Sequence, residues 1–141
     1  FQAGLKVLVP KLAAGDRVSQ GTVVLGTVRG DVHDIGRSLV GFMLESAGFT
    51  VVSLGVDVSA EAFVQAVRDH QPQVLGMSSL LTSTMLGMQD VIDELKRQGL
   101  RDQVKVIIGG SPVSKAFAEQ IGADGYGNDA ANAVTLVRSL L

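Results

Sequence analysis

Short apolar runs alternate with amphipathic segments along most of the chain. The apolar runs predict five strands, over residues 22–28, 50–54, 73–78, 104–108 and 124–126. The segments that follow them have apolar residues at helical spacing and predict helices over 35–47, 60–70, 84–98, 114–121 and 129–141. Continuously apolar strands that alternate with helices are typical of a parallel sheet covered on both faces.

We therefore predict a doubly wound α/β fold, Rossmann-like or flavodoxin-like, with a five-stranded parallel sheet in the order 2-1-3-4-5. Ser59 and Asp129 are the expected N-caps of two helices. The expected inward-facing residues of the first three helices are Leu39, Val40, Met43 and Leu44, then Ala62, Phe63, Ala66 and Val67, then Met85, Met88, Val91, Ile92 and Leu95.

The first residues have a different pattern. Residues 1–14 predict a helix, although Pro10 interrupts it, and residues 16–21 predict a linker. We expect residues 1–20 to be a short helical element plus linker, and residues 21–141 to be one domain. Because the chain starts at Phe1 without Met, we expect a fragment or a processed chain.

The loops that follow four of the predicted strands are rich in Gly, Ser, Thr and Asp. They comprise residues 29–36, 78–84, 109–113 and 127–129. Parallel strands end at the same edge of a sheet, and this edge is where open α/β sheets bind ligands. The sequence therefore predicts a binding site at this edge.

The first of these loops contains Asp31, His33 and Asp34 between two glycines, Gly30 and Gly36. A carboxylate that holds one nitrogen of a His usually prepares the other nitrogen as a metal ligand. His33 could instead be a loop residue that caps the following helix. Asp34 could be an N-cap, and Gly36 could serve packing alone.

The next two loops offer hydroxyls and space. Ser78, Thr82, Ser83 and Thr84 surround Leu80 and Leu81, a mixture that suits a cofactor pocket, although one hydroxyl would suffice as a helix cap. Gly109 and Gly110 directly follow a buried strand and would leave room for a flat ring or a nucleotide, or they could simply form a turn.

Composition narrows the chemistry. The chain has 141 residues, 46% of them hydrophobic and 18% charged, and a formal charge of −2, which favours one globular domain rather than a disordered or nucleic-acid-binding chain. No apolar run is long enough to span a membrane. The absence of Cys excludes disulfides, thiolate metal sites and Cys nucleophiles, and it is compatible with a cytoplasmic location. The sequence has neither a phosphate loop nor a nucleophile elbow, and its glycine spacing is not a dinucleotide fingerprint.

Three motifs in these loops resemble the signature of the cobalamin-binding domain family: Asp31-Val32-His33-Asp34-Ile35-Gly36, Ser78-Ser79-Leu80 and Gly109-Gly110. The resemblance covers roughly residues 20–141. The flanking residues 26–36, 80–85 and 122–130 look like the methyl-carrying branch. That branch includes the corrinoid proteins of methanol, methylamine and methoxy-aromatic methyltransferase systems and the cobalamin domain of methionine synthase. Residues 1–14 are similar to the last helix of the helical cap of that branch.

The resemblance implies a role for each matching position. His33 would bind cobalt as its metal ligand, Asp31 would hold His33, and the Thr84 hydroxyl would hold Asp31. Methionine synthase has Ser at the place of Thr84. The remaining cofactor-binding residues would be Val32, Asp34, Ile35 and Gly36 at the corrin, Ser78 and Thr82 at the nucleotide tail, Gly109 and Gly110 along its slot, Tyr126, Gly127, Asp129 and Ala130 at the end of that slot, and Leu80 from the second motif.

The resemblance also implies a function. The protein would carry a methyl group on the cobalt of a corrinoid (cobalamin or a relative), cycling between Co(I) and methyl-Co(III). Its partners would be a methyltransferase for the methyl donor, another for the acceptor, and a reductive activator of Co(II), with no nucleic acid or membrane involved. Two alternatives remain: the cobalamin domain of an adenosylcobalamin-dependent mutase, and a corrinoid-sensing or receiver-like regulatory domain. A receiver would need a Lys after the fifth strand, and none follows Tyr126.

Overall fold

The computed structural model describes residues 19–33, 35–127 and 129–141. Its strands pair in one parallel sheet with the order β3-β2-β4-β5-β6, which is 2-1-3-4-5 in chain order, as predicted. The strands are β2 (Thr22–Thr27), β3 (Thr50–Ser53), β4 (Val74–Ser78), β5 (Lys105–Gly109) and β6 (Gly125–Tyr126). The helix expected over residues 1–14 lies outside the described residues.

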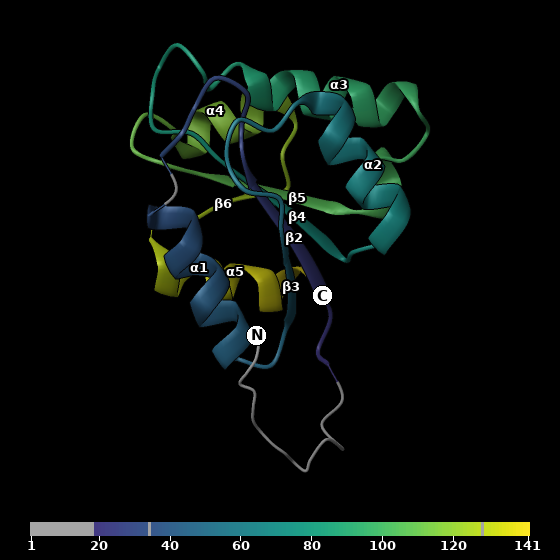
Figure 1. Ribbon diagram of the computed structural model, residues 1–141, viewed down its shortest axis with the longest axis vertical. Coiled ribbons are helices and arrows are strands. Elements are labelled where there is room, and N and C mark those ends of the chain that lie inside the picture. The colour runs from purple at the N-terminus through teal and green to yellow at the C-terminus, as the bar shows by residue number, and fades with distance from the viewer. Residues whose placement is uncertain (1–18, 34, 128) are drawn as a thin grey trace.

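Helices cover both faces of the sheet (Figure 1). α1 (Ile35–Ser46) and α5 (Ala130–Leu140) lie on one face, and α2 (Ala60–His70), α3 (Gly87–Arg97) and α4 (Lys115–Ile121) lie on the other. A short 3₁₀ turn, Arg101–Gln103, precedes β5. None of the helices in the described part of the chain has the length and the apolar run that a bilayer crossing requires.

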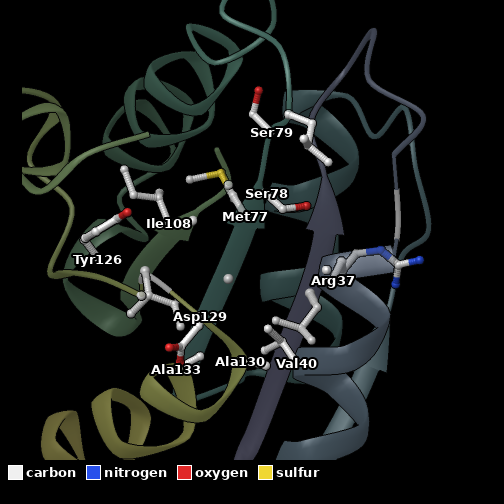
Figure 2. A pocket seen from close by; sticks show the side chains of 18 of the residues that line it. Arg37, Val40, Met77, Ser78, Ser79, Ile108, Tyr126, Asp129, Ala130 and Ala133 are labelled. Atoms are coloured by element: carbon white, nitrogen blue, oxygen red, sulfur yellow. The ribbon is translucent and has the colours of Figure 1, made fainter. Parts of the chain in front are cut away.

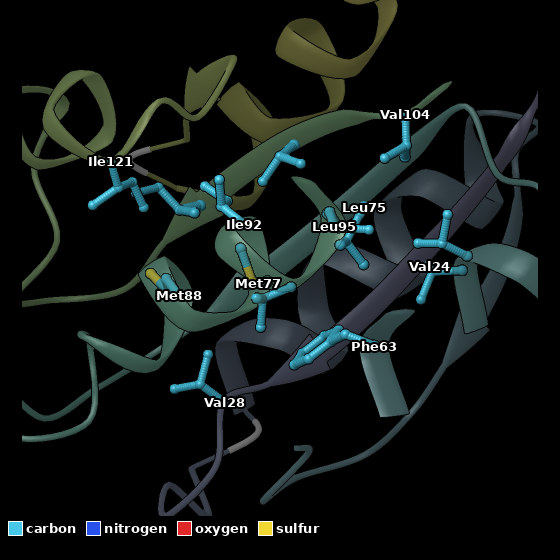
Figure 3. Close-up of a cluster of buried hydrophobic side chains, with 14 of the residues drawn as sticks. Val24, Val28, Phe63, Leu75, Met77, Met88, Ile92, Leu95, Val104 and Ile121 are labelled. Atoms are coloured by element: carbon cyan, nitrogen blue, oxygen red, sulfur yellow. The ribbon is translucent and has the colours of Figure 1, made fainter. Parts of the chain in front are cut away.

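The two faces bury cores of different size. On the side of α2, α3 and α4, large side chains that include Phe63, Leu75 and Ile92 are fully buried against the sheet (Figure 3). On the side of α1 and α5, a smaller cluster surrounds Leu25 and Leu44. Because side chains alternate along a strand, each strand contributes to both cores. The larger core supplies most of the buried apolar area, and the smaller one leaves space near the carboxyl ends of the strands.

Two predicted caps are confirmed. The Ser59 hydroxyl accepts the Ala62 N–H at 3.1 Å, and the Asp129 carboxylate accepts the Asn132 N–H at 2.7 Å. These side chains satisfy backbone donors that the first turn of a helix leaves without partners. The Asp129 cap fixes the start of α5 at the edge where the predicted site lies.

The predicted start of the third helix is wrong. α3 begins at Gly87 rather than at Thr84, and residues 82–86 form turns. The Thr84 hydroxyl lies 2.8 Å from a carboxylate oxygen of Asp31 and 3.1 Å from the Leu81 carbonyl oxygen. These tertiary and local contacts bind the segment to the neighbouring loop, which the helical periodicity of the sequence could not reveal.

Two predicted inward-facing residues are also wrong. Leu39 is 51% exposed on α1, and Ala62 is exposed on α2, where Val64 is buried instead. The residues of α1 that face the sheet centre on Val40 and Leu44. Leu39 lies outside this sector, on the outer side of the helix, although it is apolar.

Gly110 provides a test of the packing between two loops. It has a φ of +123°, and a Cβ at this position would overlap the backbone carbonyl of Ser79. Gly122 has a φ of +84° but open space around the Cβ position. We expect Gly122→Ala to lower the free energy of unfolding by about 1 kcal/mol, and Gly110→Ala to lower it by about 1–3 kcal/mol more, because a backbone segment must move. Urea unfolding of both variants measures the difference, and equal losses would contradict this packing.

Candidate functional site

The loop after β2 is held in place by the loop after β3. The Gly30 N–H donates to the Asp57 carboxylate at 2.7 Å, and the Asp57 N–H donates to the Asp31 carbonyl at 2.9 Å. Asp57 itself has a φ of +54°, an uncommon value for a residue other than Gly. The loop after β2 is therefore fixed by the loop after β3, through one contact to a side chain and one between backbone groups.

Asp31 lies at the centre of the site and is completely buried. Its Oδ1 accepts the His33 backbone N–H at 3.0 Å and lies 2.8 Å from His33 Nδ1. Its Oδ2 accepts the Leu80 N–H at 2.7 Å and the Thr84 hydroxyl at 2.8 Å. One carboxylate therefore joins the loop after β2 to the loop after β4.

Burial and hydrogen bonding act on the pKa of Asp31 in opposite directions. Burial raises it, because the charged form loses its hydration. The hydrogen bonds donated by the Leu80 and His33 backbones, the His33 ring and the Thr84 hydroxyl outweigh burial and hold the pKa of Asp31 well below its usual range. Asp31 is therefore ionised at neutral pH and presents a full negative charge to the His33 ring.

The ring of His33 is oriented but accessible. Its Nδ1 is held by Asp31, and the side chain is 47% exposed. The Thr27 hydroxyl donates to the His33 carbonyl at 3.2 Å and lies 2.9 Å from the Ser78 hydroxyl. With Nδ1 engaged, Nε2 is the nitrogen that remains for a ligand at this edge.

Two residues of the network were missed by sequence reasoning. Thr27 is buried at the end of β2, where its register partner on β4 is Ser78. Ser79 is buried, with its Oγ 2.8 Å from Thr84 Oγ1 and 3.0 Å from the Leu81 carbonyl oxygen. The sequence does show a hydroxyl residue at the end of an apolar strand in both cases. It does not show which residues these hydroxyls would contact.

A cavity of about 450 Å³ lies beside His33, between the first turns of α1 and α5 (Figure 2). One side of the cavity is the sheet near the carboxyl ends of β4 and β5, where Gly76 and Gly109 lack side chains. Its walls include Val40 from α1 and Ala133 from α5. A Cβ on Gly76 would lie 2.6 Å from Leu25 Cδ2, so this position has no room for a larger residue. Glycines of the strands and loops thus form part of the lining of this cavity, which we call the slot.

The structure brings most of the predicted cofactor-binding residues to this slot. Those that line it are His33, Gly36, Ser78, Leu80, Gly109, Gly110, Tyr126, Gly127, Asp129 and Ala130. Asp31 and Thr84 lie behind His33, Val32 is exposed beside it, and Thr82 is exposed outside the slot. Asp34 lies outside the described residues, and Ile35 is the first residue of α1.

Sequence reasoning missed about as many lining residues as it found. These are Leu25, Gly26, Arg37, Val40, Gly76, Met77, Ser79, Ile107, Ile108, Ser111 and Ala133. Most come from strand interiors or from the facing helices. They line the slot only because the smaller of the two cores stops short of the edge of the sheet.

The site offers a single His side chain as a metal ligand. In the part of the chain that the structure describes, no group of three or more Asp, Glu and His residues could hold a metal ion. A single carboxylate-held His can supply one ligand to a metal that is already held by an organic ring. Exposed apolar side chains at the same edge, Val32, Leu80, Leu81 and Leu86, would suit the face of such a ring.

The B12 binding domain family matches residues 21–135. The chain belongs to this family. The family's cofactor is a corrinoid, as expected from the three motifs.

Relatives of known name agree with this membership. Dimethylamine corrinoid protein 3 of Methanosarcina mazei is 47% identical over 137 residues, which cover 97% of this chain and 81% of that protein. The monomethylamine corrinoid protein of Methanosarcina barkeri has a similar structure, with a TM-score of 0.83 and 40% identity over 85% of this chain and 57% of that one. The methanol:cobalamin methyltransferase complex of the same species gives a TM-score of 0.83 and 35% identity, over 92% of this chain and 50% of that one. This chain thus spans about half of the length of either solved chain.

Asp31→Asn tests the buried charge in the ligand-free protein. The folded-state pKa of Asp31 lies below its unfolded value of about 4, so ionised Asp31 stabilises the fold above that pH, and the contribution is lost as the pH falls toward the folded pKa. We expect the free energy of unfolding of the variant to be about 2 kcal/mol lower than that of the wild type at pH 7. This difference between the two proteins should shrink below about pH 4. Urea unfolding as a function of pH measures this gap.

Asp102→Asn is the matched control, because Asp102 is exposed in the 3₁₀ turn. It should change stability little at any pH. A gap for Asp31→Asn that is constant from pH 7 to pH 3, or equal to that of the control, would contradict the role of the buried carboxylate.

Proposed function

We propose that this chain is the corrinoid-binding part of a methyl carrier in a methyltransferase system. The observation that carries the proposal is the pairing of His33 Nδ1 with the buried Asp31 carboxylate at 2.8 Å, at the mouth of a small-residue slot. When bound, the corrinoid supplies the cobalt that accepts and gives up the methyl group. The chain's own residues hold the cofactor and adjust the strength of its lower ligand.

His33 is the proposed metal ligand, through Nε2. Asp31 fixes the orientation of the ring through the contact with Nδ1, which leaves Nε2 as the ligand atom. The Thr84 hydroxyl holds Asp31 from the other side. This His33–Asp31–Thr84 network can keep or share the Nδ1 proton, so the strength with which Nε2 binds a metal is coupled to protonation.

The slot is the proposed site of the corrinoid's nucleotide tail. Its volume of about 450 Å³ falls within the range of small-molecule pockets. Gly109 and Gly110 leave the floor open, Ser78 offers a hydroxyl, and residues 126–130 border the far end. Because Thr82 lies outside the slot, we assign the polar contact with the tail to Ser78.

The corrin ring itself would lie over the edge of the sheet. Val32, Leu80 and Gly36 provide an apolar and uncrowded surface around His33. Asp34 and Ile35 belong to the same segment, and we include them among the residues that contact the ring, on the strength of the motif. A planar group of this size would cover apolar side chains that are otherwise in water.

The proposed partners are a methyltransferase for the donor and a second one for the acceptor, with a reductive activator that restores the cobalt. The relatives' names mention dimethylamine, monomethylamine and methanol, which supports a small methylated compound as the donor. We also propose that residues 1–20 belong to a helical cap and linker before the cobalamin domain of residues 21–141. The cysteine-free sequence is compatible with a cytoplasmic location.

His33→Gly tests the metal ligand. We expect the variant to retain corrinoid through the slot, while the visible spectrum of the protein loaded with methylcobalamin changes, because the lower nitrogen ligand is lost. His70→Gly, a change on the exposed end of α2, is the control and should leave the spectrum as it is. An unchanged spectrum in His33→Gly would rule out His33 as the ligand. Retention of adenosylcobalamin in preference to methylcobalamin would favour the mutase alternative.

Ala130→Leu tests the slot without touching His33. Ala130 lines the slot from the first turn of α5, whereas Ala131 is exposed and does not line it. Filling the slot should cost about 1–3 kcal/mol of binding free energy, so we expect roughly 5- to 150-fold weaker retention of hydroxocobalamin in Ala130→Leu. Ala131→Leu should bind like wild type. Equal retention in the two variants, measured by absorbance after gel filtration, would place the tail elsewhere.

A further inference from the structure

The outer face of α1 carries two adjacent apolar side chains that the proposed function does not use. Leu39 is 51% exposed and Phe42 is 66% exposed. Three residues apart, they lie next to each other on the helix surface, and we call this pair the α1 outer patch. The other large apolar residues exposed in the described ranges are the four at the corrinoid edge and the terminal Leu141.

The chain enters the domain beside one end of this helix. The Gln20 N–H donates to the Gly48 carbonyl at 3.0 Å, and its side-chain amide donates to the Ala47 carbonyl at 2.9 Å. The hydroxyls of Ser19 and Thr50 are also hydrogen-bonded, at 2.9 Å. Residues 1–18 are therefore joined to the domain next to the carboxyl end of α1.

The patch is within easy reach of that point. Along a helix, Phe42 lies about 9 Å and Leu39 about 14 Å from the level of Gly48. An extended chain covers such distances with about three to five residues, and 18 residues precede Ser19. Other apolar side chains of the described domain that are exposed lie in the loops at the opposite edge or at the C-terminus.

The preceding segment has the composition to cover the patch. It carries Leu5, Leu8, Val9 and Leu12 at helical spacing, followed by Val18. It also carries a formal charge of +2, from Lys6, Lys11 and Arg17 against Asp16. On α1, Glu45 is exposed, and the last turn of the helix has no basic residue of its own. A basic segment beside the carboxyl end of α1 would complement both Glu45 and the negative end of the helix dipole.

We propose that the segment Leu5–Val18 docks along the outer face of α1 and covers Leu39 and Phe42. The segment then runs from the edge where Gln20 is fixed toward the edge that bears His33, because α1 starts directly after the His33 loop. This docking would place the start of the chain beside the proposed corrinoid site. The proposal does not rest on corrinoid binding and can be tested on the ligand-free chain.

The natural chain contains no Cys, so pairs of introduced cysteines report proximity without interference. We would oxidise two variants of the whole chain, Val18→Cys with Phe42→Cys and Leu12→Cys with Leu39→Cys. The control is Leu12→Cys with Gln65→Cys, because Gln65 is exposed on α2 across the sheet. Docking raises the effective concentration of one thiol near the other, so we expect intramolecular disulfide at about tenfold or more the yield of the control.

Two results would overturn the proposal. Intramolecular yields equal to the control would show that the segment does not lie on α1. Disulfide-linked dimers of Phe42→Cys or Leu39→Cys variants, in place of intramolecular bonds, would show that a second copy covers the patch.

A second measurement uses the absence of Trp from the chain. Leu12→Trp places a single reporter in the segment, and docking should shift its emission to shorter wavelength. Changing Leu39→Ser together with Phe42→Ser, both on the exposed side of α1, should return the emission to that of a solvent-exposed Trp. An emission that is the same in both backgrounds, with each protein folded by circular dichroism, would equally overturn the docking.

Discussion

A buried negative charge fixes the geometry of the candidate site. Removing a carboxylate from water is costly unless hydrogen-bond donors replace the hydration. At Asp31 those donors come from two different loops: His33 on one side, Leu80 and Thr84 on the other. The carboxylate can stay ionised only while the loops after β2 and β4 remain in this arrangement, so the cost of burial becomes a constraint on their positions.

This constraint determines what His33 can do. An imidazole on a free loop would rotate and would lose entropy when it bound a metal. In this site one ring nitrogen is held and the backbone carbonyl is fixed by Thr27, so the other nitrogen is presented at the edge in advance. An imidazole that is held in this way could release a metal and bind it again in the same orientation.

The slot beside His33 exists because the two cores differ in size. Phe63, Ile92 and Leu95 fill the side of α2 to α4 and stabilise the domain there. The other side has the smaller cluster around Leu44 and Val137, between the sheet and the helices α1 and α5. The larger core and the slot therefore lie on opposite faces of one sheet, and a bulky residue at Gly76 or Gly109 would fill the slot without adding to the larger core.

The fold could be predicted because strand and helix periodicities are strong and each element is short. The pairing of Asp31 with His33 could also be predicted, because the two residues are close in sequence and their loop lies between a strand and a helix. Thr27, Ser79 and Gly76 were missed because their importance depends on neighbours about 50 residues away or on an adjacent strand. Thr84 was predicted as a site residue from a motif, yet the same tertiary contact that gives it this role also ends the helix pattern around it.

Electron paramagnetic resonance of the Co(II) corrinoid bound to protein containing ¹⁵N-labelled histidine tests the central claim most directly. If Nε2 of His33 is the lower ligand, the nitrogen splitting of the cobalt signal changes from the triplet produced by ¹⁴N to the doublet produced by ¹⁵N. A triplet that persists would show that the corrinoid keeps its own base, and a signal without nitrogen splitting would show that no nitrogen binds. Either result would contradict the assignment of His33 as the lower ligand of cobalt.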